Sequence, residues 1–139
     1  MPQIITKSSQ ETFEFAKKIA SKLRGGEVIA LFGDLGAGKT VFTQGLASGL
    51  GLKKNINSPT FVVMKVYENK KGIGLVHVDA YRLQGGDDLV NMGAGDYISS
   101  KRFITVIEWP ENVKKFLPKK VLRFRFHNTR NDRERKIIF

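Results

Sequence analysis

Residues 33–40 read GDLGAGKT and match the phosphate-binding loop pattern G-x-x-x-x-G-K-[ST] at every fixed position. The residues before them, 27–32, form a short apolar run typical of a buried strand. The residues after them, 41–50, have the pattern of a helix that closes at Gly51. A strand, a glycine-rich loop and a helix in this order let backbone N–H groups and the helix dipole converge on one phosphate group. The chain is therefore predicted to be an α/β protein that binds a nucleoside triphosphate.

Individual loop positions have distinct expected roles. Lys39 would reach the β- and γ-phosphates, and the Thr40 hydroxyl would bind Mg²⁺. The alternative is a glycine-rich turn that only joins a strand to a helix, but it requires both residues to stand at the required positions by chance. The other loop residues expected to border the nucleotide are Gly33, Leu35, Gly36, Ala37 and Gly38.

Composition bounds the class of protein. A chain of 139 residues with 41% hydrophobic and 27% charged residues is typical of a globular protein, so we expect one domain over residues 1–139. The absence of cysteine excludes disulfides and a thiol nucleophile. The sequence contains neither an apolar run of the ~20 residues that a membrane span needs nor a signal-peptide pattern, which predicts a cytoplasmic protein without a membrane partner.

Periodicity elsewhere in the chain predicts a mixed sheet, because strands alternate with helices early and pair antiparallel late. We expect a P-loop NTPase-type α/β fold with a mixed, mostly parallel sheet flanked by helices, a C-terminal antiparallel hairpin and the nucleotide at the strands' carboxyl ends. The other predicted strands cover residues 4–5, 61–67, 73–78, 103–107, 121–126 and 136–139. One further helix is predicted after the Ser8–Glu11 capping box and another over residues 110–117. Short helices are expected around Leu89 and Tyr97.

Two predicted strands end in an acidic residue. Asp79 ends the run 74–79, and Glu108 ends the run 104–108. A phosphate loop needs an acidic group on the metal side, normally at the end of a neighbouring strand. Either carboxylate could therefore hold Mg²⁺ while the other orients the attacking water, although acidic residues at strand ends are also common on protein surfaces. The pattern alone does not decide between them.

Three other side chains have weaker functional patterns. His77 shares a strand face with Asp79, yet a lone histidine in a strand is more often a packed or hydrogen-bonded structural residue. Trp109 directly follows Glu108 at a strand end and could shield the metal or contact a partner, although a partly buried core aromatic residue is the more ordinary interpretation. His127 lacks convergent partners in the sequence and is expected at the surface.

Four segments in order resemble one family. They are GDLGAGKT at 33–40, SPTF at 58–61, HVDAYR at 77–82 and IEWPE at 107–111. This series is similar to the bacterial TsaE (YjeE) proteins, small ATPases of the pathway that installs threonylcarbamoyl on the adenosine next to the anticodon of certain tRNAs. The resemblance covers essentially the whole chain, and it implies ATP and Mg²⁺ as cofactors.

The resemblance also implies roles for single residues. Thr40 and Glu108 would hold Mg²⁺, and Asp79 would be needed for activity. Thr60 would belong to a switch loop near the γ-phosphate. With Lys39, Asp79 and Thr60 form the predicted catalytic set. The residues that would border the adenine are Ser9 and Asp132.

Family members join the pathway's threonylcarbamoyl transferase and its partner subunit, and their ATP hydrolysis supports repeated turnover. The resemblance therefore implies these two partners. Val41 stands where the family often has a second threonine, outside the ligating position. The acidic segment 87–93 is a looser version of the family's, which weakens the partner assignment slightly.

Positive charge gathers near the C-terminus. The formal net charge is +11, and residues 114–139 contribute ten Lys or Arg against two acidic residues. On a strand, Arg123 and Arg125 would lie on one face, with Phe124 and Phe126 on the other. This surface is either a solvated sheet face or a contact for tRNA or an acidic partner through phosphate-type contacts. The sequence lacks a recognisable RNA-reading motif, which argues against selection of the tRNA by this chain alone.

Three functions fit these patterns. The first is an ATPase, weak in isolation, within a tRNA-modifying assembly. The second is a small-molecule kinase of the P-loop class, although 139 residues leave little room for an acceptor pocket and a lid. The third is a binding module that uses the nucleotide only as a conformational switch. ATP turnover without an acceptor, and partner affinity in each nucleotide state, would separate them.

Overall fold

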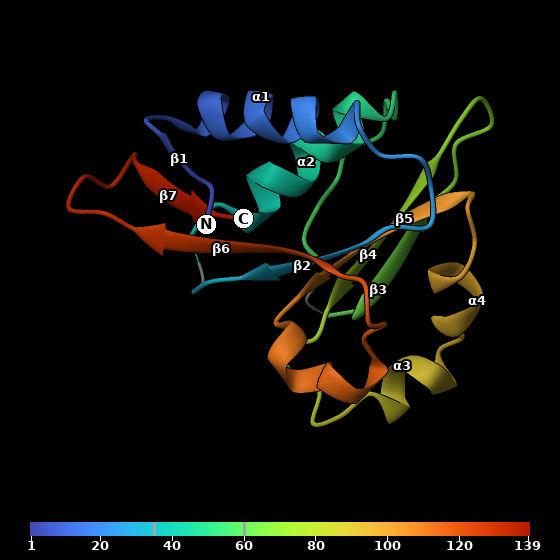
Figure 1. Cartoon of the computed structure of the whole chain (residues 1–139). Helices are drawn as coiled ribbons and strands as arrows, with labels where there is room; N and C mark the ends of the chain where they lie inside the picture. Colours follow the sequence, from blue (N-terminus) through green and yellow to red (C-terminus); the bar gives the residue numbers. More distant parts are fainter. Residues whose placement is uncertain (35, 60) are drawn as a thin grey trace.

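The computed structural model describes residues 1–34, 36–59 and 61–139 (Figure 1). A seven-stranded sheet with the order β1-β7-β6-β2-β5-β4-β3 forms its centre. The strands are β1 (Gln3–Thr6), β2 (Val28–Phe32), β3 (Met64–Tyr67), β4 (Gly74–Asp79), β5 (Phe103–Glu108), β6 (Leu122–Asn128) and β7 (Arg135–Ile138). Because β1 pairs with β7, the two ends of the chain lie side by side, and the Phe139 N–H donates to the Pro2 carbonyl at 3.0 Å.

Strand directions confirm the predicted mixed, mostly parallel sheet. The central pairs β6–β2, β2–β5 and β5–β4 are parallel. At the edges, β3 pairs antiparallel with β4, and β7 pairs antiparallel with β6 and β1. The C-terminal hairpin forms as predicted, with Arg125 opposite Ile138. The carboxyl ends of β2, β4 and β5 therefore meet at one edge of the sheet, where the sequence predicts the nucleotide.

Helices α1 (Ser9–Ala20) and α2 (Lys39–Gly49) cover one face of the sheet (Figure 1). The Ser8 hydroxyl caps α1 by accepting from the Glu11 N–H at 3.1 Å, as the capping-box spacing predicts. The buried core on this side is aromatic, with the Phe42 ring centred 5.0 Å from that of Phe124 and 5.4 Å from that of Phe126. This packing anchors the helix that follows the phosphate loop.

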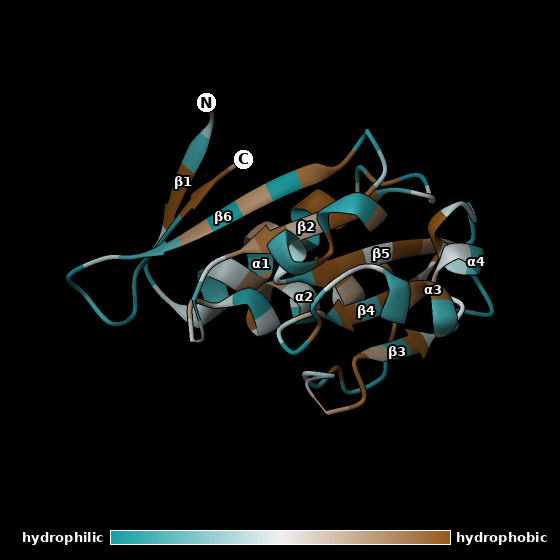
Figure 2. Ribbon diagram, turned by 90° about the horizontal axis from the view of Figure 1, so that it is seen from below, coloured by the Kyte–Doolittle hydropathy of each residue, from teal (hydrophilic) through white to brown (hydrophobic). Residues whose placement is uncertain are grey.

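The opposite face is covered unevenly. Helices α3 (Asp87–Asn91) and α4 (Gly95–Ile98) and the 3₁₀ helix η1 (Pro110–Phe116) pack against β4 and β5, with Leu89 and Val113 buried among strand side chains. On β6, the even-numbered Phe124 and Phe126 are buried in the other core, whereas Arg123 on this side is exposed. Hydrophobic and hydrophilic bands accordingly alternate along β6, while β5 is mostly hydrophobic (Figure 2).

One predicted strand is partly wrong. Residues 61–67 are apolar or aromatic except for Lys65, but β3 begins only at Met64. The Pro59 carbonyl accepts the N–H groups of Val62 (3.1 Å) and Val63 (2.6 Å), so the chain turns there. Val63 adopts φ of +68°, which a β-branched residue rarely does. Phe61 is left 85% exposed, because the turn removes it from the sheet.

Helix boundaries also differ from the prediction. The helix predicted over residues 41–50 begins two residues earlier, at Lys39. Helix α1 ends at Ala20, although the apolar spacing continues to Leu23. The segment predicted as a helix over residues 110–117 is a 3₁₀ helix that bends at Val113. The short helices expected around Leu89 and Tyr97 are confirmed as α3 and α4.

Candidate nucleotide-binding site

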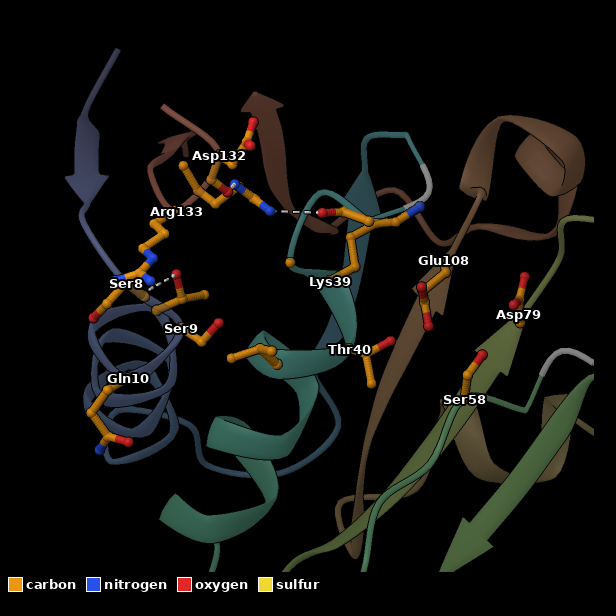
Figure 3. Close-up of a pocket in the computed structure, with 15 residues that line it drawn as sticks. Ser8, Ser9, Gln10, Lys39, Thr40, Ser58, Asp79, Glu108, Asp132 and Arg133 are labelled. Carbon is orange, nitrogen blue, oxygen red and sulfur yellow. Dashed lines mark hydrogen bonds between the residues drawn. The ribbon is translucent and has the colours of Figure 1, made fainter. Parts of the chain in front are cut away.

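A cleft of about 620 Å³ opens at the carboxyl edge of the sheet, between α1, the loop before α2 and the β6–β7 turn (Figure 3). Eight residues predicted for the site line it: Ser9, Gly36, Gly38, Lys39, Thr40, Asp79, Glu108 and Asp132. Two further predicted residues, Gly33 and Ala37, do not line the cleft, and Ala37 is buried. The predictions for Leu35 and Thr60 fall outside the described residues.

The backbone of the loop requires glycine at defined positions. Gly33 has φ of +145°, and a Cβ there would meet the Phe126 Cβ and carbonyl oxygen at 3.0 Å. Gly38 has φ of +98° and is the N-cap residue of α2. Since glycine has no side chain to cap the helix, the N–H groups of the first turn remain available to an anion. The loop therefore has the backbone form that phosphate binding needs.

Lys39 is the buried cation of the cleft, with only 4% of its surface exposed. Its Nζ donates to the Gly33 carbonyl at 2.5 Å and lies 4.3 Å from the centre of the Trp109 ring. Burial lowers the pKa of Lys39, and the charges of Glu108 and Asp79 oppose this shift without cancelling it. The ammonium group is therefore incompletely compensated, and a phosphate group would supply the missing negative charge.

The two predicted carboxylates are neighbours in the sheet. Asp79 and Glu108 stand opposite each other in the β4–β5 register, and each is about 5% exposed. Asp79 Oδ1 accepts from the Tyr81 N–H at 3.0 Å. His77 Nε2 lies 2.6 Å from Glu108 Oε2, and the His77 side chain is fully buried. The orientation of both carboxyl groups is thus held by neighbouring groups.

A metal ion in this cleft would take its ligands from both the protein and the nucleotide. Within the described residues, no group of three His, Cys, Asp or Glu side chains is placed to hold a metal ion. Mg²⁺ usually takes one or two protein ligands and completes its shell with phosphates and water. The Thr40 hydroxyl points toward Glu108 across the cleft (Figure 3), so this pair of oxygen donors fits that requirement.

The far end of the cleft is built from α1 and the β6–β7 turn. Ser9 and Gln10 line it from α1, and Asp132 and Arg133 line it from the turn, with the Arg133 side chain extending toward Ser8 (Figure 3). Ser9 and Asp132 belong to the predicted set, whereas the other two do not. A glutamine in the first turn of a helix and an arginine in a turn have no pattern that distinguishes them from surface residues.

Arg135 is a site residue that sequence reasoning missed. Its guanidinium donates to the Gly36 carbonyl at 2.9 Å and to the Asp132 carbonyl at 2.6 Å, and so links the β6–β7 turn to the phosphate loop. Its Nε is buried without a hydrogen-bond partner among the described residues. In the sequence, Arg135 is one of ten basic residues near the C-terminus, so its contact with a loop 99 positions away leaves no local signal.

Trp109 is half-buried and packs against the core on the α3 and α4 side of the sheet, as predicted for a core aromatic residue. It adopts φ of +57°, and its ring centre lies 4.9 Å from that of Tyr81. The Trp109 ring thus lies between Lys39 and the Tyr81 ring, while the backbone N–H of Tyr81 donates to Asp79. His127 is exposed, as predicted, and lies outside this cleft.

Comparisons with known proteins agree with the geometry. The family model described as "Threonylcarbamoyl adenosine biosynthesis protein TsaE" matches residues 6–137. The tRNA threonylcarbamoyladenosine biosynthesis protein TsaE from Bacillus subtilis is 37% identical over 134 residues, which cover 96% of this chain and 82% of the relative. Its counterpart from Streptomyces coelicolor is 40% identical and covers 86% of this chain and 80% of the relative.

A solved structure, the crystal structure of Bacillus subtilis YdiB, superposes with a TM-score of 0.79 at 32% identity. The match covers 98% of this chain and 82% of that chain. No described helix is both long and apolar enough to cross a membrane. Family model, relatives and fold lead to the same assignment: the chain is a member of the TsaE family.

Proposed function

We propose that the protein binds and hydrolyses ATP as a component of tRNA threonylcarbamoyladenosine biosynthesis, the process named in the descriptions of its relatives. The proposal of ATP hydrolysis is supported mainly by the convergence of Lys39, Asp79 and Glu108 in one cleft at the start of α2. A buried cation beside two buried carboxylates is the charge pattern of a phosphoryl-transfer site. Localisation in the cytoplasm, where tRNA is modified, belongs to the same proposal.

Each residue has a role in this proposal. Lys39 binds the β- and γ-phosphates, and the N–H groups at the start of α2 hold the phosphate oxygens. Thr40 and Glu108 would hold Mg²⁺, which when bound neutralises charge on the phosphates. Asp79 orients a water molecule whose oxygen attacks the γ-phosphorus, and the bond to the β,γ-bridging oxygen breaks to release ADP and phosphate.

The adenine would occupy the far end of the cleft, between Ser9 and Asp132. The support is spatial, because this end lies beyond the phosphate loop and is walled by α1 and the β6–β7 turn. Arg135 joins that turn to the loop carbonyl of Gly36, so the two ends of the cleft are mechanically connected.

Hydrolysis would serve the partners rather than form the threonylcarbamoyl group. We assign the pathway's transferase and its partner subunit as the proteins that respond to the nucleotide state. A ligand shifts a conformational equilibrium only by binding the two states unequally, and ATP differs from ADP at the γ-phosphate. The Asp79 N–H donates to the Val63 carbonyl at 2.8 Å, so the turn after Pro59 is tied to the γ-phosphate side of the cleft. Thr60 remains a prediction for this switch.

The test is a reconstituted threonylcarbamoylation reaction, with and without the protein, that counts modified tRNA per transferase. We expect several turnovers only when the protein and ATP are both present, and Lys39→Ala should behave like omission. Phosphate release without any acceptor would favour an ATPase over a kinase. Normal modification without the protein would contradict the proposal. If tRNA modification requires the protein but is unchanged by Asp79→Asn, the protein acts as a nucleotide-switched binding module rather than as an ATPase.

A further inference from the structure

A second cavity lies behind the phosphate loop, on the side of the sheet opposite α1 and α2. It has a volume of about 810 Å³ and is larger than the nucleotide cleft. Its floor is formed by Phe32, Gly33 and Asp34, and its walls by η1 with the loop after it and by β6. We call this cavity the basic groove, since four Lys or Arg side chains and one His line it: Lys114, Lys119, Arg123, Arg125 and His127.

The positive side chains come from separate segments and converge. Arg123, Arg125 and His127 alternate along β6 on the face that α3, α4 and η1 leave open. Lys114 and Lys119 face them from η1 and the loop after it, and both are exposed. The groove also contains two carboxylates, but Asp34 belongs to the phosphate loop and Glu111 to the first turn of η1. Among the described residues, no ion pair joins either carboxylate to a basic side chain of the groove, so these charges are available to a polyanion.

Spacing and ring chemistry favour a nucleic-acid backbone. Alternate residues on a strand are about 6.6 Å apart, which is close to the separation of successive phosphates along an extended nucleic-acid strand. The Arg125 guanidinium carbon lies 4.5 Å from the centre of the half-buried Phe32 ring. Arginine planes and aromatic rings are the surfaces on which unpaired bases stack.

We propose that the basic groove binds RNA through backbone phosphates, without reading the base sequence. The choice of RNA over an acidic protein rests on the proposed place of this protein in tRNA modification. Because Gly33 and Asp34 line the groove and also begin the phosphate loop, RNA held there lies directly behind the nucleotide cleft. Bound RNA and bound nucleotide thus contact opposite sides of one loop.

The chain offers a matched pair of variants for the test. The groove variant is Lys114→Ala with Lys119→Ala. The control is Lys115→Ala with Lys120→Ala, which removes the same charge from the neighbouring positions. All four lysines are exposed, but only Lys114 and Lys119 line the basic groove. Thermal unfolding should be unchanged in both variants, because none of these side chains belongs to the core.

Binding of a fluorescent, unmodified tRNA transcript is measured for both variants over a range of salt concentrations. We expect the groove variant to lose roughly tenfold in affinity at low salt. The negative slope of log K against log salt should become shallower by about 1.5, because two phosphate contacts are lost. The control should stay within about twofold of wild type. Equal losses in both variants, or no loss in the groove variant, would overturn the proposal.

Two further measurements separate the possible failures. Binding of poly-glutamate in place of tRNA tests an acidic protein as the occupant. If the groove variant loses affinity for poly-glutamate but not for tRNA, the assignment to RNA is overturned. ATP binding should be the same in wild type, groove variant and control, since Lys39 and Thr40 are untouched. If none of the three proteins binds ATP, the proposed function is wrong, whereas the tRNA-binding measurement still decides the RNA proposal independently.

Discussion

The two cavities on either side of the phosphate loop use the same residue types in opposite ways. In the nucleotide cleft, Lys39, Asp79 and Glu108 are almost fully buried, and each contacts a neighbouring group. In the basic groove, Lys114 and Lys119 are exposed. Buried charges interact strongly and are weakly screened, whereas exposed charges are screened over about 10 Å at 0.1 M salt. The cleft is therefore suited to one defined ligand and the groove to a polyanion held loosely.

The largest expected effect tests the buried side of this comparison. Lys39→Ala removes the ammonium group aimed at the β- and γ-phosphates, and Thr40→Ala removes an oxygen donor for Mg²⁺. Each should reduce ATP hydrolysis by roughly a hundredfold or more, measured as phosphate release by the purified protein. The groove pair Lys114→Ala with Lys119→Ala is the control and should retain wild-type turnover. Wild-type hydrolysis by both cleft variants would remove the basis for the site.

A second prediction separates the two carboxylates within the cleft. Glu108→Gln should raise the Mg²⁺ concentration needed for nucleotide binding by about tenfold, because an amide oxygen is a weaker ligand for a hard cation. Asp79→Asn should keep nucleotide binding but slow hydrolysis by roughly a hundredfold, if this carboxylate orients the water. Titration of Mg²⁺ against bound nucleotide, with single-turnover hydrolysis, distinguishes them. The reversed pattern would exchange the two roles.

A third prediction concerns His77, which holds one oxygen of Glu108 at 2.6 Å. His77→Leu should raise the Mg²⁺ requirement by about tenfold, the usual effect of losing a group that orients a metal ligand. His77→Gln keeps a donor and should recover most of the loss. Val76→Ala, at the next buried position, is the control for general destabilisation and should lower thermal stability without changing the Mg²⁺ requirement. If His77→Leu changes the Mg²⁺ requirement no more than Val76→Ala does, His77 has only a structural role.

The smallest effect is on stability and follows from the lowered pKa of Lys39. Between that lowered pKa and the ordinary value of 10.5, the unfolded chain binds more protons than the nucleotide-free folded protein. The free energy of unfolding of wild type, relative to that of Lys39→Met, should therefore rise with pH in this window and be constant below it. Thermal denaturation of both proteins across alkaline pH checks the sign. A relative stability that falls with pH would mean that the cleft stabilises the charged form.

Regular local patterns were predicted well. The run 27–32, the glycine-rich loop and the helix after it depend on contacts within a few residues, so their pattern indicates them directly. The segment 61–63 is the contrasting case. Its apolar residues have strand-like character, but the hydrogen bonds to the Pro59 carbonyl turn the chain before a strand can begin.

The candidate site was predicted in part for the same reason. Four site residues lie in the phosphate loop or at the end of a recognisable strand, so the order of motifs along the sequence is enough to predict them: Lys39, Thr40, Asp79 and Glu108. Arg135 cannot be found in this way, because its contact with Gly36 joins segments 99 positions apart. The bond between His77 and Glu108 likewise requires knowing that β4 and β5 are neighbours in register.

The sequence by itself determined the phosphate loop, the order of strands and helices and the family, because glycine geometry, hydrophobic period and motif spacing act over short stretches of chain. Only the tertiary structure decided which charges are buried and which face water. The parallel alignment of β2, β4 and β5 buries Lys39 beside two carboxylates, whereas β6 presents an exposed Arg123 and a half-buried Arg125 to the groove. Burial is set by what packs on each sheet face, and that depends on segments far apart in the chain.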